Sequence, residues 1–240
     1  MKDHDDVHPD DEDLVLASRD ALVSALLAAG PNQSTLCEGW QTQHLAAHIH
    51  LREMSPLAAG LLVRPLSRPL GGKTMALGDR ASTPHEFSAL VERIATGPPV
   101  AARARGSRVL TRLGSTGPAR RLSELSNLLE FYVHTEDVRR AQPRWAPRRL
   151  SEEYADALFR QLRAVARVHY RKTTHGTTLV RTNGDSIEVN PLKTLVPGAR
   201  RATSAAGSVG SRTYISGPAG ELVMHAFGRT EHALVLVDAA

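Results

Sequence analysis

Residues 128–140, LLEFYVHTEDVRR, largely decide how the rest of this chain is interpreted. Large apolar side chains surround two ionisable ones, Glu130 and His134, which lie four residues apart and therefore on one face of a helix. Ser123, Asn127 and Asp137 follow the same steps of three or four residues. Together with Glu130 and His134 they form a polar stripe along the border of the helix's apolar face. Burial of an unpaired charge is costly. The spacing therefore suggests that the carboxylate and the imidazole bind one metal ion.

A third ligand is expected from a helix that begins near Thr42 and ends before Pro56. It carries three histidines, of which His48 lies among apolar residues and is the best candidate, with His44 as the runner-up. Two imidazoles and one carboxylate leave positions open on a metal, as in catalytic sites. They suit Zn, Ni or Fe. The alternative is a weak Glu–His pair on a solvated helix face, beside an ordinary, partly buried histidine.

Composition favours a protein of the cytoplasm. The first 13 residues hold seven acids and one lysine, so residues 1–10 are predicted to be a disordered acidic tail, not a secretory signal. The remaining chain has 29 basic and 18 acidic residues, but the basic ones are dispersed and lack interleaved aromatics, which disfavours nucleic-acid binding. No apolar run approaches the ~20 residues that cross a membrane. A single cysteine, Cys37, excludes an internal disulfide.

The pattern along the chain changes near residue 170. Before it, helical periodicity predicts a mainly α, metal-binding helical bundle over residues 11–170, and after it short β-rich runs predict a small α/β domain over 171–240. Thr83 and Glu86 form a capping-box pattern, and TNGD predicts a tight hairpin between TTLVR and SIEVN. The predicted helices are 11–29, 42–55, 83–97, 123–140 and 151–170; connections are expected at 57–80 and 100–120, and a flexible loop at 192–212.

Three motifs carry a resemblance to a known family. TLCEGWQTQHLAAHI, NLLEFYVHTEDVRRAQPRW and GELVMHAFGR resemble the mycothiol-dependent maleylpyruvate isomerase-like branch of the DinB-like metalloprotein superfamily, and in particular an actinobacterial group of metal-binding proteins. The resemblance covers the chain from about residue 12 to its end. It implies an up-down four-helix bundle followed by a small sterol-carrier-like α/β domain.

The same resemblance implies a site and a cofactor. The family's metal ligands fall on His48, Glu130 and His134, and Arg229 is similar to an arginine that takes part in activity. Related members use a low-molecular-weight thiol, mycothiol, as cofactor or co-substrate. The chain departs from the family pattern at His44, where an acidic residue is usual, so the cap that an acidic residue would provide is lost and a candidate for a fourth nitrogen ligand is gained.

The expected function is activation of a thiol for addition or transfer to a small electrophile, by an isomerase or S-transferase, in a monomer or homodimer. Asn127 and Asp137 are candidates to orient a ligand imidazole, although Asp137 could instead pair with Arg139 or Arg140 at the surface. Arg229 would bind a substrate carboxylate. Cys37 is expected to be a small packed residue.

Two other functions remain open at this stage. The first is a non-catalytic metal-binding regulatory or interaction module, in which His44 would be the fourth ligand. The second is a nucleic-acid surface on Arg103, Arg105, Arg108 and the 192–212 loop, with affinity that falls steeply with salt.

Overall fold

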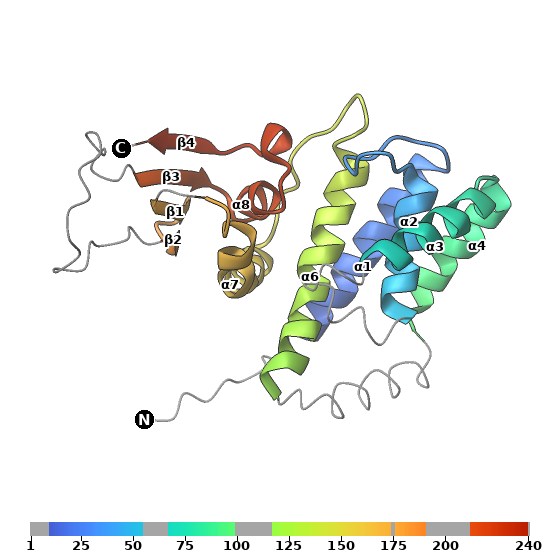
Figure 1. Cartoon of the computed structure of the whole chain (residues 1–240), viewed down its shortest axis with the longest axis horizontal. Coiled ribbons are helices and arrows are strands. Elements are labelled where there is room, and N and C mark those ends of the chain that lie inside the picture. The colour runs from blue at the N-terminus through green and yellow to red at the C-terminus, as the bar shows by residue number, and fades with distance from the viewer. Residues whose placement is uncertain (1–9, 55–66, 99–116, 174–175, 191–211, 240) are drawn as a thin grey trace, which may run out of the picture. The chain divides into compact units, whose positions relative to one another are not determined.

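A computed structural model describes residues 10–54, 67–98, 117–173, 176–190 and 212–239. This part of the chain is mainly helical, with a small four-stranded mixed sheet toward the C-terminal end (Figure 1). The chain divides into two compact units, Met1–Arg149 and Leu150–Ala240. Among the described residues, no helix has the length and apolar character needed to cross a membrane. Residues 1–9 of the predicted acidic tail and most of the 192–212 loop lie outside the described residues, whereas Asp10, predicted to belong to the tail, begins the first helix.

The first unit is built from helices. They are α1 (Asp10–Ala29), α2 (Thr42–Met54), α3 (Ser67–Arg80), α4 (Pro84–Thr96) and α6 (Gly117–Arg139). Helix α1 packs against α6 and α4, and α2 packs against α3 and α4 (Figure 1). Apolar side chains from these helices form one core, and burying each large one stabilises the fold by about 1.5–3 kcal/mol. The core includes Leu22, Leu26, Leu45, Ile49, Phe87, Leu90, Val91, Ile94 and Phe131.

Local sequence signals set the ends of α4 as predicted. The backbone N–H of Glu86 donates to Thr83 Oγ1 (3.3 Å), and the Thr83 hydroxyl donates to Glu86 Oε2 (2.8 Å). Gly97, with φ of 72°, ends the helix in a conformation that favours glycine. The prediction of Thr83 as the cap is confirmed, whereas Glu86 bonds the Thr83 hydroxyl and not the backbone N–H that a capping box uses.

Helix α3 corrects the prediction that residues 57–80 form a connection. Its two Gly-rich turns lower helix propensity, which is why the sequence favours a loop. Packing against α2 offsets this cost: Thr74 and Gly78 are buried, and Gly78 lies so close to His44 that an added Cβ would stand 2.4 Å from His44 Cδ2 and 2.9 Å from its Cα. Likewise, α6 begins at Gly117, inside the segment 100–120 that was predicted to be irregular.

Replacing Gly78 by alanine is expected to destabilise the protein by about 1–3 kcal/mol, since a close helix contact would be overpacked. Urea unfolding followed by circular dichroism measures this change. Gly72→Ala is the matched control, because Gly72 lies on the same helix with nothing within 4 Å of the added Cβ. That control should be neutral or stabilising by up to about 1 kcal/mol. Equal effects of the two substitutions would contradict the α2–α3 contact.

The second unit combines helices with the sheet. Its elements are α7 (Glu152–His169), β1 (Gly176–Arg181), β2 (Ser186–Asn190), β3 (Arg212–Gly217), α8 (Ala219–Ala226), the short 3-10 helix η3 (Thr230–His232) and β4 (Leu236–Ala239). The strand order is β2-β1-β3-β4, with β1 and β3 parallel and the other pairs antiparallel. The predicted hairpin between β1 and β2 is confirmed, and Gly184 in its turn has φ of 97°.

Helix α7 belongs to this second unit, so the units divide at 149/150 and not at the expected 170. Its buried apolar face packs against α8. Arg181 of β1 also reaches α7, where its guanidinium bonds to Glu152 (2.9 Å) and to Asp156. The sequence shows that α7 is amphipathic, but periodicity does not reveal which partner covers the apolar face.

Candidate metal centre

Helices α2 and α6 bring together the three predicted ligands. One ligand atom from each of His48, Glu130 and His134 lies within 4.8 Å of the other two. His134 Nε2 is 3.4 Å from Glu130 Oε2, and the rings of His48 and His134 meet edge to face with centroids 5.3 Å apart. These distances are compatible with one shared cation, although metal binding itself stays a prediction.

His48 is held in the form that a ligand requires. Burial and the neighbouring His134 lower the pKa of His48 to about 4, so its imidazole is neutral at pH 7 and keeps a nitrogen lone pair. The Trp40 ring lies beside it, with a centroid distance of 5.1 Å. Trp40 therefore covers one side of the site and is also a natural fluorescent reporter of it.

Glu130 is held as a carboxylate. Burial on its own would raise the pKa of Glu130, but the Arg52 guanidinium and the His134 imidazole outweigh burial and bring this pKa to about 2. Arg52 Nε lies 3.8 Å from Glu130 Oε2, and Arg52 Nη1 donates to Asn127 Oδ1 (2.7 Å). The sequence suggested Asn127 as a partner of a ligand imidazole; it instead bonds the arginine that stabilises Glu130.

Asp137 fixes the other ring nitrogen of His134. Its Oδ2 lies 2.9 Å from His134 Nδ1, and because a carboxylate only accepts, Nδ1 carries a proton and Nε2 faces Glu130. Burial lowers the pKa of His134, but bonds to Asp137, Cys37 and Glu130 outweigh it and raise the pKa well above 6.5. Carboxylates paired with metal-ligating histidines in this way orient the ring and raise its basicity. This supports the orienting role predicted for Asp137.

The alternative prediction for Asp137, an ion pair at the surface, is wrong about the location of the side chain. The Asp137 side chain is fully buried, whereas both arginines bond to the neighbouring Glu136.

Cys37 forms a contact that sequence analysis missed. Its Sγ lies 3.2 Å from Asp137 Oδ2 and 3.9 Å from His134 Nδ1, and the three residues form a second group of possible metal ligands among the described residues. Cys37 packs against the core as expected. A backbone bond from Leu36 N–H to the Asp137 carbonyl (3.0 Å) holds its turn against α6. No local signal predicts this contact, since about a hundred residues separate its partners.

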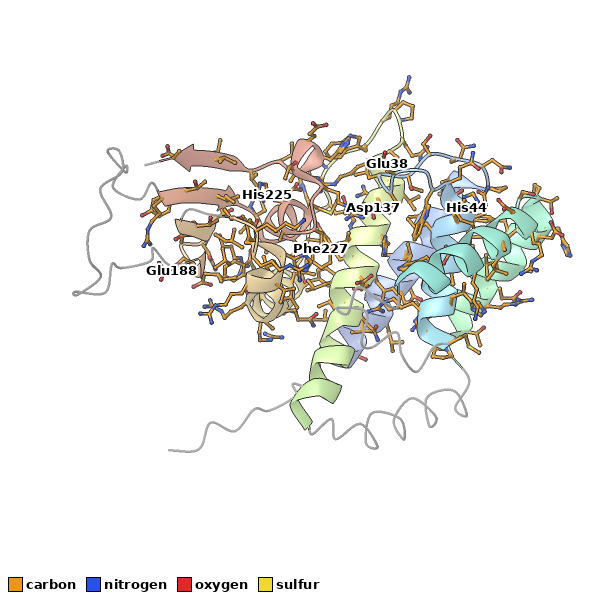
Figure 2. The ribbon with its side chains drawn as sticks, in the orientation of Figure 1. Glu38, His44, Asp137, Glu188, His225 and Phe227 are labelled. Atoms are coloured by element: carbon orange, nitrogen blue, oxygen red, sulfur yellow. The ribbon has the colours of Figure 1, made fainter. Side chains whose placement is uncertain are left out.

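Among the described residues, His44 belongs to neither group of possible metal ligands. The backbone N–H of Gln41 donates to His44 Nδ1 (3.1 Å), which puts the proton on Nε2, 3.0 Å from Asp79 Oδ1. His44 thus does for α2 what a glutamate does in a capping box: its side chain satisfies the N–H that precedes the first turn. Figure 2 labels His44 on α2 and Asp137 on α6. The loss of a cap inferred at this position is also wrong, because histidine replaces the acidic residue in the same role.

Arg229 lies in the second unit, just before η3, and its Nη1 donates to the Phe227 carbonyl (2.6 Å). Its contact with a substrate carboxylate stays a prediction. The arginines of the nucleic-acid alternative, at positions 103, 105 and 108, lie outside the described residues.

The fold and the site together define a mainly helical protein with a candidate metal centre between α2 and α6. Comparisons with protein-family models, with curated proteins and with solved structures give no match. The function is therefore inferred from the site itself and from the motifs.

Proposed function

We propose that this protein is a metal-dependent enzyme that activates a low-molecular-weight thiol for addition or transfer to a small electrophile. His48, Glu130 and His134 hold the divalent cation, with Zn as the first candidate and Ni or Fe as alternatives. One observation carries the proposal: three donors of the right kind converge from two helices. The DinB-like bundle and mycothiol as the thiol rest on the motif resemblance.

The donor set fits a divalent cation of this kind. His48 has a neutral imidazole and Glu130 an ionised carboxylate, so both are in the protonation state that metal binding requires. His134 Nε2 must lose its proton to become a ligand, whereas its Nδ1 proton stays bonded to Asp137. Two histidines and one carboxylate are a ligand set of catalytic Zn and non-haem Fe sites, which keep positions open.

A bound cation would supply Lewis acidity, which lowers the pKa of a thiol so that the thiolate is present near neutral pH. The chain's own residues prepare the site. Arg52 keeps Glu130 ionised, Asp137 fixes the His134 ring, and Trp40 shields His48 from water on one side. These groups set the orientation and charge of the ligands before a substrate arrives.

A thiolate in this site supports two reaction types. Addition to an activated double bond, rotation about the resulting single bond and expulsion of the thiolate would isomerise the substrate without net consumption of thiol. Attack with departure of a leaving group would form a lasting carbon–sulfur bond, as in an S-transferase. The two reactions share the nucleophile and differ in the electrophile.

The non-catalytic alternative is less well supported. A closed structural site needs a fourth protein ligand. His44, the expected source of that ligand, is bonded to Gln41 and Asp79.

Metal content tests the first half of the proposal. Protein purified without a histidine tag or chelator is expected to carry about one equivalent of metal, and His134→Ala to carry little, because a ligand is lost. His50→Ala is the matched control, since His50 lies on α2 outside both groups of possible ligands. Wild-type protein that is free of metal and fails to bind added Zn or Ni would overturn the proposal.

A thiol titration tests the second half. In cobalt-loaded Cys37→Ala protein, added N-acetylcysteine is expected to produce a sulfur-to-cobalt charge-transfer band, because the protein itself then has no thiol. A full complement of cobalt without such a band would contradict thiol activation and favour the non-catalytic module.

A further inference from the structure

A second feature of the first unit is a cavity of about 490 Å³ along α1 and the end of α6. Alanines of α1, at positions 21, 25, 28 and 29, form its apolar side. Arg139, Arg144, Arg148 and Trp145 also line it, and the lining, which lies wholly within described residues, contains no acidic side chain. The cavity therefore combines an apolar wall with positive charge.

The charged side chains that line this cavity are all positive. One fully buried carboxylate, Glu136, accepts bonds from Arg139 Nη1 (2.8 Å), Arg140 Nε (2.7 Å) and Arg148 Nε (2.8 Å). Of the arginines that line the cavity, Arg139 and Arg148 share this one carboxylate, which is not part of the lining, and Arg144 adds a third positive charge at the cavity wall. Positive charge in a partly enclosed space favours an anion.

Arg148 has hydrogen-bonding capacity that the protein does not use. Its Nη2 is buried and has no hydrogen-bond partner, although the guanidinium lies over the Tyr132 ring at 4.8 Å. Buried donors without an acceptor are rare and costly in folded proteins. A carboxylate or phosphate beside this guanidinium would supply the acceptor once the group turns. Arginine is well suited to such planar, two-point contacts.

We propose that this cavity binds a small organic anion, with its flat apolar part against the alanine face and Trp145 and its charged head at Arg139 and Arg148. The site goes beyond the proposed metal chemistry: its apolar wall comes from α1, whereas the third metal ligand comes from α2. Its occupancy does not depend on the metal.

The two tryptophans allow a direct test. Trp40→Phe leaves Trp145 as the only tryptophan, so its emission reports on the cavity and not on the metal centre. Benzoate and phenyl phosphate are expected to change this emission saturably, with or without a chelator. Uncharged benzamide and inorganic phosphate, which lack the charge and the apolar body respectively, should bind much more weakly. No response to either organic anion, or equal binding of benzamide, would overturn the proposal.

Matched variants assign the binding to the cavity. Arg139→Gln is expected to weaken benzoate binding about tenfold, since a hydrogen bond to a charged group is lost. Arg80→Gln removes the same charge at an exposed position on α3 and should leave binding unchanged. Ala28→Glu, at an exposed helix position on the cavity wall, should abolish binding by repulsion even if Arg139→Gln alters the fold. Equal affinities in Arg139→Gln and Arg80→Gln, or unchanged binding in Ala28→Glu, would contradict the site.

Discussion

Replacing Glu136 by glutamine is expected to lower the free energy of unfolding by about 3–5 kcal/mol, the typical cost of breaking a buried ion pair by removing one partner. Glu136 and Arg140 are both fully buried, and Arg139 and Arg148 share the same carboxylate. A neutral amide removes the negative charge that these three guanidinium groups share. Urea unfolding followed by circular dichroism measures the loss.

Two further variants test whether the loss of stability comes from the buried charge of Glu136. Glu92→Gln, an exposed position on α4, should change the unfolding free energy by no more than about 0.5 kcal/mol. The double variant Glu136→Gln/Arg140→Met should lose less than the two single variants summed, because it removes both a buried charge and its partner. A loss of under about 1 kcal/mol in Glu136→Gln would show that Glu136 is not the counter-charge that the fold needs.

Replacing Asp137 by asparagine is expected to weaken metal binding about 10- to 100-fold, as is typical when a carboxylate behind a ligand histidine is lost. The amide has no negative charge to stabilise the His134 ring and does not force the Nδ1–H tautomer. The amide would also replace the carboxylate as the hydrogen-bond partner of the Cys37 thiol. Competition with a chromophoric chelator, on protein first stripped of metal, measures the change in affinity.

Asp79→Asn is the matched control for this experiment. Asp79 also bonds a histidine, His44 Nε2 at 3.0 Å, but its side chain is 70% exposed and belongs to neither group of possible ligands. The two substitutions therefore remove the same charge from the same type of pair. If both lower metal affinity equally, Asp137 acts only through net charge and the orienting role is contradicted.

The sequence alone determined the features that depend on neighbouring residues. The i, i+4 spacing of Glu130 and His134 places both on one helix face in any fold that keeps the helix. The ends of α4 follow from Thr83, Glu86 and Gly97, and the β1–β2 turn follows from Asn183 and Gly184. These signals act within a few residues, so the features can be predicted without knowledge of the rest of the chain.

Only the tertiary structure decided which distant groups meet. The sequence offered His44 and His48 as alternatives; helix packing places His44 beside Asp79 of α3 and His48 beside His134 of α6. It also brought Cys37 to Asp137, made a helix of the Gly-rich segment at 67–80 and paired α7 with α8. These outcomes depend on close packing between segments far apart in the chain, and the apolar periodicity of one helix does not identify the surface that covers it.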